Sequence, residues 1–434
     1  MNLLYSNDRR GTYPPSWYAA TASMLDPLPE LKGEQHADVC VVGAGYTGLS
    51  AALHLAQKGL DVVVVDAQRV GFGASGRNGG HVGTGFNLEP WTLEKLVGEQ
   101  NARRLWDFSE EGKALTRSLI EAHAPDAHLR DGIAHAQWKA SGVADYHKLV
   151  DWLAETYGYE KGEKLDRDAM QALVKSPRYQ GGIVDWGSAH IHPLNYVLGL
   201  ARACLAAGVR LHELSPVHKV DGGSNPVVRC DRGFVHCSHV VLATNGYGGR
   251  LNAKVAARVM PINNFMVATE PLGERAADVL SKEVAVDDSK FVVNYFHLSP
   301  DKRLIFGGGE SYGYKFPADI AAKVRPRMEN LFPQLQGVKI DYAWGGTLAI
   351  TMTRMPYLTR PAPNVWSSSG YSGYGVSLSG FCGKLMAEAI AGETERFDLF
   401  SNTPAMRFPG GARTRQGLLA IAMTWYSLRD KLGI

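Results

Sequence analysis

The chain has 434 residues, of which 45% are hydrophobic and 21% are charged, as in an ordinary soluble globular protein. Its 46 Lys and Arg and its 43 Asp and Glu leave a formal net charge of +3, which argues against a nucleic-acid-binding protein. Five scattered cysteines without a C-x-x-C pair disfavour a disulfide scaffold and a zinc ribbon. Neither a secretory signal nor a run of about 18 apolar residues is visible, so we expect a cytoplasmic protein without a transmembrane segment.

The N-terminal part of the chain predicts a βαβ unit over residues 37–66. Apolar, β-branched runs at 39–42 and 62–65 predict two buried strands, and the stretch between them predicts a helix. A glycine-rich turn joins the first strand to this helix: Gly43-Ala44-Gly45-Tyr46-Thr47-Gly48. Such glycines permit a tight turn, close approach of the backbone to a pyrophosphate and close helix packing. Asp66 follows the second strand, where a carboxylate suits ribose hydroxyls and repels a 2′-phosphate. The unit therefore predicts an ADP-ribosyl site and disfavours NADP.

A second glycine-rich loop follows the second strand: Gly71-Phe72-Gly73-Ala74-Ser75-Gly76-Arg77-Asn78-Gly79-Gly80. Its bare backbone, with Ser75, Arg77 and Asn78, could wrap a second phosphate and lie close to a flat ring. The same composition also suits a solvated loop. Because FAD and NAD share the ADP-ribosyl group, the residues alone leave both cofactors open.

The rest of the chain mixes parallel and antiparallel signals. The alternating runs at 291–298 and 303–306 flank a turn with Pro at its second position, which predicts a hairpin. Further strands are predicted at 132–138, 209–213, 227–235, 239–243 and 365–369, and helices at 193–207 and 376–391. Parallel-type pieces near both ends thus enclose antiparallel pieces, which predicts two interleaved domains.

Several stretches make the chain similar to a known family, the D-amino-acid-oxidase-like flavoenzymes. They are residues 18–22, 41–50, 71–80, 190–195, 354–356, 370–373, 408–411 and 426–430. The two glycine motifs are shared by the whole superfamily, whereas the motif at 190–195 and the two motifs nearest the C-terminus are more particular to one amine-oxidising branch. The resemblance runs nearly from end to end.

This resemblance implies an α/β fold, in which a Rossmann-like FAD-binding domain is interleaved with an α+β substrate domain built on an antiparallel sheet. We expect the FAD-binding domain at 36–90, 187–250 and 343–400, the substrate domain at 91–186 and 251–342, and a C-terminal extension with a helix at 401–434.

The resemblance also implies FAD, held noncovalently, as the cofactor. The pyrophosphate and ribose would lie at Gly43, Ala44, Gly45, Tyr46, Thr47, Gly48, Asp66 and Ala67. The second loop would line the phosphates and flavin with Gly73, Ala74, Ser75, Gly76, Arg77, Asn78, Gly79, Gly80 and His81. Further contacts are implied at Val217, Ala243, Thr244, Asn245, Gly346, Ser372, Gly373, Tyr374, Gly375 and Val376. His81 and Tyr374 replace the Gln and His that are usual in this branch, so covalent attachment at His81 remains an alternative.

Amine oxidation by hydride transfer needs correct placement of a neutral amine rather than an acid–base dyad. An aromatic pocket suits it, because aromatic rings attract a protonated amine. Alternation in the run 291–298 places Tyr295 and His297 on one face. These two are our first catalytic candidates on the substrate side, followed by Trp344 and Tyr374, although aromatic residues of a sheet are as often plain core.

The expected function is FAD-dependent oxidation of a primary amine, γ-glutamylputrescine or a similar ω-amino compound. An aldehyde, ammonia and, with molecular oxygen as acceptor, hydrogen peroxide would be formed. Related α-amino-acid oxidases usually carry Arg near the position of residues 344–347, and its absence favours an amine without a carboxylate at the reacting carbon. The alternatives are a dehydrogenase of the same family that uses a quinone or other carrier, a non-catalytic flavoprotein and a nicotinamide dehydrogenase.

Two further features carry weaker expectations. His190 and His192 lie two apart without a third ligand nearby, so we expect no metal and a structural corner before Pro193. The apolar stretch 418–426 predicts a helix that packs on the flavin domain, mediates an oligomer or touches a membrane surface.

Overall fold

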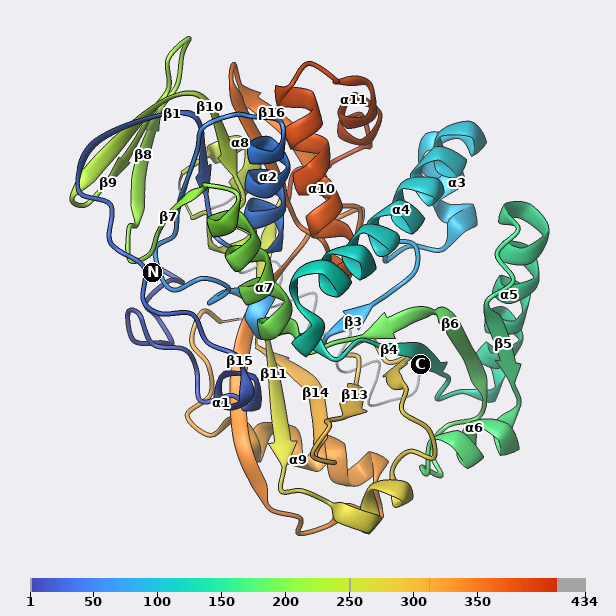
Figure 1. The fold of residues 1–434 in the computed structure, drawn as a ribbon. Coiled ribbons are helices and arrows are strands. Elements are labelled where there is room, and N and C mark those ends of the chain that lie inside the picture. The colour runs from blue at the N-terminus through green and yellow to red at the C-terminus, as the bar shows by residue number, and fades with distance from the viewer. Residues whose placement is uncertain (1, 250, 312, 412–434) are drawn as a thin grey trace.

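The computed structural model describes residues 2–249, 251–311 and 313–411. In these residues the chain forms two large β-sheets flanked by helices, the first in the upper and the second in the lower part of Figure 1. The chain passes from one sheet to the other several times, so neither sheet is built from one continuous stretch. The predicted α/β architecture of two interleaved units is therefore confirmed.

The first sheet has eight strands and a parallel centre. Its main order is β16-β17-β10-β1-β2-β7, of which all but the β16–β17 pair run parallel. The strands β8 and β9 form an antiparallel extension on β10. The bounds are β1 Gly33–Val42, β2 Val62–Val65, β7 Arg210–His212, β8 Val217–Asp221, β9 Val227–Cys230, β10 Gly233–Leu242, β16 Tyr357–Ala362 and β17 Val365–Ser369. The valine-rich runs of β1 and β2 are fully buried, as expected of central strands covered on both faces.

The helices beside this sheet pack on one another. The helix α2 (Tyr46–Gln57) contacts both α7 (Pro193–Ala206) and α10 (Gly375–Ile390). Ser50 Oγ on α2 donates to the carbonyl oxygen of Gly380 on α10 at 2.6 Å. This contact fixes the helix after the first glycine turn against the helix near the C-terminal end of the described chain.

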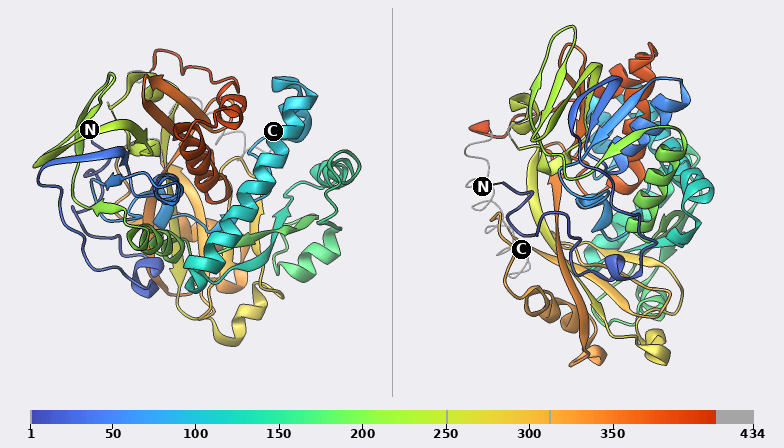
Figure 2. Two further views of the ribbon diagram at one scale, coloured as in Figure 1. Left: turned by 45° about the horizontal axis from the view of Figure 1, so that its top comes forward. Right: turned by 60° about the vertical axis from the view of Figure 1, so that its left-hand side comes forward.

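The second sheet has nine strands, mostly antiparallel. Its order is β15-β11-β14-β13-β12-β4-β6-β3, and β5 pairs with β6. The bounds are β3 His81–Val82, β4 Arg130–Ala136, β5 Gly162–Leu165, β6 Gly182–His190, β11 Met260–Thr269, β12 Ala285–Asp288, β13 Tyr295–Leu298, β14 Leu304–Ser311 and β15 Ile340–Ile350. The helix α9 (Ile320–Leu331) buries Val324, Met328 and Leu331 against this sheet. In Figure 2 the long strands β11 and β15 run from the first sheet down to the end where α9 lies.

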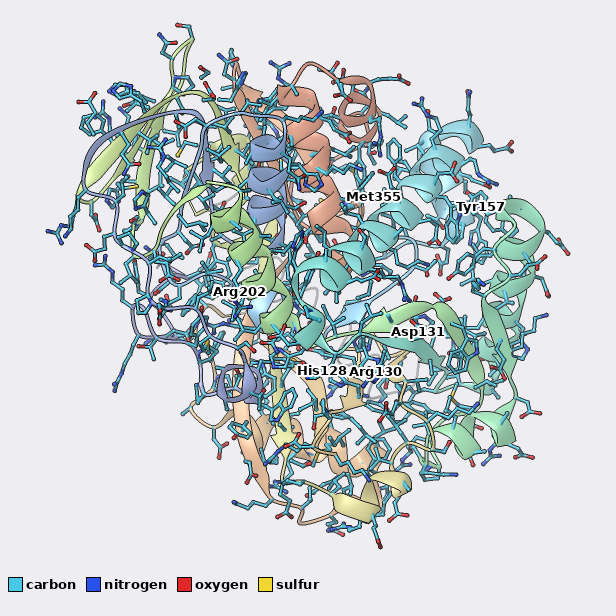
Figure 3. All side chains as sticks on the ribbon, in the orientation of Figure 1. His128, Arg130, Asp131, Tyr157, Arg202 and Met355 are labelled. Carbon is cyan, nitrogen blue, oxygen red and sulfur yellow. The ribbon has the colours of Figure 1, made fainter. Side chains whose placement is uncertain are left out.

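The remaining helices flank the two sheets. Their bounds are α1 Trp17–Thr21, α3 Pro90–Val97, α4 Glu99–His123, α5 Val143–Tyr157, α6 Arg167–Leu173, α8 Ala253–Ala256 and α11 Glu395–Ser401. The side chain of Asp131, at the start of β4, is marked in Figure 3 and pairs with Arg117 of α4 at 2.8 Å. No helix in the described part of the chain is both long enough and apolar enough to cross a bilayer.

The predicted hairpin is present, although its first strand is shorter than expected. The strands β13 and β14 pair antiparallel, and Lys302 N–H donates to the carbonyl oxygen of Ser299 at 2.8 Å in the turn. Two of the expected domain boundaries fall inside strands of the second sheet, at 186/187 in β6 and at 342/343 in β15. The predicted helix at 418–426 lies outside the described residues.

Candidate active site

One cavity of about 560 Å³ takes its wall from both sheets. The first sheet contributes the ends of β1 and β2 and the residues that follow β10, and the second contributes residues of β4, β11, β12, β13, β14 and β15. Every residue predicted for the cofactor lines this cavity except Gly48, Gly76 and Gly80. A side-chain carbon at these three positions would lie 1.9, 2.3 and 2.2 Å from a backbone oxygen. These three glycines therefore do not border the cavity, but they allow the close backbone contacts that give the two loops their shape.

The turn between β1 and α2 closes through one tight contact. A side-chain carbon at Gly48 would collide with the carbonyl oxygen of Gly43, so α2 can approach β1 this closely only with glycine here. Ser75 Oγ accepts the N–H of Tyr46 at 3.1 Å and joins this turn to the second glycine loop. The first amides of α2 thus lie at the cavity, where a helix N-terminus suits an anionic group.

Asp66 follows β2 and lines the cavity beside this turn. Its Oδ2 accepts the N–H of Ala44 at 2.7 Å, and its Oδ1 accepts the N–H of Gln68 at 2.8 Å. Burial raises the pKa of Asp66 to about 6, and the two backbone hydrogen bonds oppose this rise. Because a carboxylate oxygen has two lone pairs, each oxygen can still accept a hydroxyl from the cavity.

The side chains of the second glycine loop mainly hold the loop in place. The Arg77 guanidinium is buried, and its Nη1 lies 3.0 Å from Asp8 Oδ2 and 3.0 Å from the carbonyl oxygen of Gly345 on β15. Asn78 Oδ1 accepts the N–H of Gly80 at 2.7 Å. Arg77 therefore ties the loop to the second sheet, and Asp8 balances its charge.

The start of α10 forms a third part of the cofactor-side wall. Asn245 Oδ1 accepts the N–H of Gly370 at 2.9 Å, and Asn87 Nδ2 donates to the carbonyl oxygen of Ser372 at 2.5 Å. Tyr374 occupies the N-cap position of the helix. The positive end of α10 consequently points at the cavity and would stabilise negative charge there.

His81 lies where the second loop enters β3. Its Nδ1 is 3.0 Å from the carbonyl oxygen of Gly79, and its Nε2 is 3.3 Å from that of Val286. Burial lowers the pKa of His81, although Asp287 and these carbonyls oppose the change. Both ring nitrogens are thus directed at backbone acceptors.

The second sheet supplies the opposite wall of the cavity, which we call the roof. It includes Asn264 and Met266 of β11, Asp287 of β12, Tyr295 of β13 and Glu310 of β14. The Tyr295 hydroxyl donates to Asn264 Oδ1 at 2.6 Å. Its ring crosses Gly307 of the intervening strand, where a side-chain carbon would lie only 2.1 Å from the ring. Tyr295 therefore lies across the middle of the roof.

Beside Tyr295 the roof carries an ion pair of Asp287 and His135. The strands β12 and β4 place the two residues in register, with His135 Nδ1 at 2.7 Å from Asp287 Oδ1. Burial by itself would raise the pKa of Asp287, but the charge and hydrogen bond of His135, together with His81, have the larger combined effect, and the pKa is lowered. Burial would likewise lower the pKa of His135, but Asp287 outweighs it and the pKa is raised. Tyr146 and Tyr374 line the same cavity, so a carboxylate faces a chamber with several aromatic rings.

Two further ionisable residues, Glu310 and Arg354, also line the cavity. Burial raises the pKa of Glu310 to about 7, against the opposing effects of Arg354 and Arg327. Arg354 enters from the turn after β15 with φ of 64°. Arg354 belongs to the family stretch 354–356, but its place at the cavity was not expected from the sequence, because the turn brings it there from beyond residues 344–347.

Two of the four catalytic candidates line the cavity and two do not. Tyr295 and Tyr374 line it, whereas His297 and Trp344 lie outside its wall. His297 shares a face of β13 with Tyr295 but packs on His190, with ring centroids 4.9 Å apart. Trp344 Nε1 donates to the carbonyl oxygen of Arg77 at 3.2 Å. We therefore withdraw the substrate-side assignment of His297 and Trp344, which support neighbouring segments instead.

The corner predicted before Pro193 is confirmed. His192 is the N-cap of α7, and its Nδ1 accepts the N–H of Asn195 at 3.1 Å. This hydrogen bond explains why an imidazole precedes a proline at the start of a helix.

The comparisons with known proteins agree with this geometry. A family model described as FAD dependent oxidoreductase matches residues 38–389. A probable oxidoreductase, OrdL, of Rhizobium meliloti is 40% identical and covers 96% of this chain and 97% of its own. The gamma-glutamylputrescine oxidoreductase of Escherichia coli is 40% identical over 96% of this chain and 99% of its own. Glycine oxidase from Bacillus cereus has a similar fold, with a TM-score of 0.69 at 19% identity, over 85% of this chain and 99% of its own.

The chain therefore belongs to the family of FAD-dependent oxidoreductases that the sequence motifs indicated. Among its relatives are oxidoreductases of the gamma-glutamylputrescine type, similar to it over nearly the whole length of both chains.

The residues present fit FAD. The cavity is lined by a glycine turn that has no room for side chains, by the carboxylate of Asp66 at the end of β2, and by the N-termini of α2 and α10. The start of α2 would hold the pyrophosphate, Asp66 the adenosine ribose, and the start of α10 the pyrimidine side of the flavin. When bound, FAD supplies the acceptor for a hydride from carbon.

The roof charges were not foreseen in the sequence. Asp287, His135, Glu310 and Arg354 all line the cavity, and only Arg354 belongs to a stretch shared with the family, residues 354–356. For the other three, the one available signal was an acidic pair, Asp287 and Asp288, at the end of an otherwise apolar run. Strand register in the folded sheet is what brings Asp287 next to His135, about 150 residues earlier in the chain, and no local pattern encodes it.

Replacing Asp66 by Asn tests the cofactor assignment. We expect FAD to bind about 10–100-fold more weakly, because a hydrogen bond to a charged acceptor is worth about 1.5–3 kcal/mol. Titration of the apoprotein with FAD, followed by flavin fluorescence, measures this change. Asp61→Asn, an exposed carboxylate before β2 that pairs with Arg210 at 2.7 Å, is the matched control. Equal affinities of the two variants would contradict the assignment.

Replacing Glu310 by Gln tests the buried carboxylate. As pH rises from about 4.5 to about 7, the unfolded chain releases the Glu310 proton while the folded chain retains it, so the wild type loses stability over this range. Gln carries no charge, so we expect the Tm of the variant to exceed that of the wild type at pH 7.5 by about 1–3 °C and by less at pH 5.

Thermal melts at both pH values check this expectation, with the exposed Glu395→Gln as control. A Tm difference that is the same at pH 5 and pH 7.5 would show that Glu310 does not titrate as described.

Proposed function

We propose that this protein oxidises a primary amine, γ-glutamylputrescine or a closely similar ω-amino compound. The observation that carries the proposal is one cavity in which the dinucleotide motifs face a roof with Asp287 and Tyr295, and which the aromatic rings of Tyr146 and Tyr374 also line. Aromatic faces and a carboxylate together are the groups that recognise an alkylammonium ion. The printed name of the Escherichia coli relative supports the choice of amine.

In this proposal Asp287 receives the ammonium end of the substrate. His135 keeps the carboxylate in one orientation through the hydrogen bond from its Nδ1. The aromatic part of the lining disfavours the charged form of the amine and so opposes the effect of Asp287, and the substrate has to lose its proton before the carbon–hydrogen bond breaks. Tyr295, held by Asn264, sets the distance between the roof and the opposite wall.

The overall reaction that we propose consumes the amine, water and molecular oxygen. The carbon next to nitrogen loses a hydride and the nitrogen loses a proton, and together these reduce oxygen to hydrogen peroxide. Water adds to the resulting imine, which releases the aldehyde and ammonia. FAD is proposed to be held noncovalently, which agrees with the contacts of both His81 nitrogens to backbone carbonyls.

A substrate panel tests the function. Purified holoenzyme is mixed with γ-glutamylputrescine, putrescine, N-methyl amines and α-amino acids, and peroxide is measured together with anaerobic bleaching of the flavin absorbance. We expect γ-glutamylputrescine to bleach the flavin and to yield peroxide. Turnover of only α-amino acids or N-methyl amines would remove the proposed substrate class. Bleaching with dye-linked activity but no peroxide would replace oxygen by another carrier.

Replacing Asp287 by Asn tests the proposed ammonium site. We expect kcat/KM for the amine to fall about 10–100-fold, mainly through KM, because the variant keeps the shape of the side chain but loses a charged hydrogen-bond acceptor. Steady-state kinetics measure the change. Asp131→Asn is the control, since Asp131 lies at the exposed start of β4. An unchanged KM in Asp287→Asn, with a normal flavin content, would contradict the assignment.

A further inference from the structure

The roof carries a second charged group well separated from Asp287. Glu310 lies on β14, two strands from β12, and its register partner on β11 is Asn264. Asp287 on β12 is in register with Tyr295 on β13, and Tyr295 is in register with Gly307 on β14. Gly307 is in turn in register with Met266 on β11, which is two residues from Asn264. Glu310 is three residues from Gly307 on β14, but the register shift makes this an offset of two residues on β11. With strands about 4.8 Å apart and a rise of about 3.4 Å per residue, the backbone positions of Asp287 and Glu310 are about 12–14 Å apart.

Glu310 is a buried carboxylate with an unsatisfied oxygen. Its Oε2 is buried and has no hydrogen-bond partner among the residues that the structure describes. Two arginines, Arg354 and Arg327, oppose the rise in the pKa of Glu310. The Nε of Arg327 donates to Asn294 Oδ1 at 2.9 Å, and its Nη2 donates to the carbonyl oxygen of Val292. Arg354 is the one that lines the cavity with Glu310. The cavity wall therefore includes both an incompletely hydrogen-bonded carboxyl group and a guanidinium group.

Resting on the amine-oxidising function proposed above, we propose that Glu310 and Arg354 form a second subsite, which binds the zwitterionic α-amino-acid end of a long substrate. The α-ammonium group pairs with Glu310 and the α-carboxylate with Arg354, while the reacting amine lies at Asp287. An acid and a base on the wall of one cavity are together complementary to a zwitterion, and to neither a simple cation nor a simple anion.

The length of the substrate agrees with this arrangement. In a γ-glutamyl amide of a four-carbon diamine, ten bonds separate the terminal amine nitrogen from the α-amino nitrogen, which in an extended chain span about 12 Å. The diamine alone has five such bonds and spans about 6 Å. Only the longer molecule can contact both charged positions of the roof.

The position of Arg354 also bears on the expectation, drawn from the absence of arginine at residues 344–347, that the substrate has no carboxylate at its reacting carbon. The cavity does contain a cation for a carboxylate, Arg354, which comes from the turn after β15 and opposes the rise in the pKa of Glu310. An arginine at the reacting end would select α-amino acids, whereas an arginine at the far end selects an amino-acid group remote from the reacting carbon.

Kinetics with two substrates test the subsite. γ-Glutamylputrescine and N-acetylputrescine share the reacting end, but only the first carries the zwitterion. We expect Glu310→Gln and Arg354→Gln each to lower kcat/KM for γ-glutamylputrescine about 10–100-fold through KM, and to leave N-acetylputrescine within about twofold. Arg354→Lys should recover part of the loss. Glu393→Gln, an exposed carboxylate that pairs with Lys58, is the control.

Binding of γ-glutamyl-n-butylamide gives a readout that does not depend on turnover. This compound has the zwitterion but no reacting amine, and calorimetry with the holoenzyme should show binding that each variant weakens about tenfold or more. Such binding without turnover of either amine would refute the proposed function and leave the subsite standing. No binding by the wild type, equal kinetic losses for both putrescine derivatives, or turnover of α-amino acids that Arg354→Gln abolishes would overturn the subsite.

Discussion

The geometry of the cavity depends on one close contact, the approach of the start of α2 to the carbonyl oxygen of Gly43 at the end of β1. The position of Gly48 leaves no room for a side chain, so the helix N-terminus lies directly against the end of the sheet. Ser75 and Asp66 then bind the amides of Tyr46 and Ala44 and fix the turn from two sides. With this contact in place, the backbone itself forms the wall for an anionic dinucleotide.

The two sheets share the site because the chain passes between them repeatedly. Arg77 of the first unit contacts Gly345 of β15, and the Ser372 backbone of the first unit contacts Ala349 of the same strand, with its N–H donating to the carbonyl oxygen at 3.0 Å. The cofactor wall and the roof are therefore held at a set distance by hydrogen bonds rather than by a flexible linker. A rigid separation of this kind suits a reaction that needs placement above a ring more than it needs proton transfer.

The chemistry of the roof follows from strand register. A buried charge is costly unless it is paired, and Asp287 meets this requirement through His135 on the neighbouring strand. Glu310 meets it less completely, because its Oε2 lacks a hydrogen-bond partner in the described part of the chain. An incompletely satisfied carboxylate at a cavity is a group whose free energy a ligand can improve, which is the physical reason for proposing a substrate contact at this position.

The sequence by itself determined the α/β fold class, the βαβ unit with its glycine turn, the second glycine loop and the helix that begins at residue 375, because each of these depends on local pattern and on spacing within about thirty residues. It also placed Tyr295 and Tyr374 at the cavity. The tertiary structure alone decided that His297 and Trp344 lie outside the wall, and that Asp287, His135, Glu310 and Arg354 line it. The reason is physical: pairing between strands distant in sequence is set by the packing of the whole sheet, and alternation within one strand shows which residues share a face but not which part of that face borders a cavity.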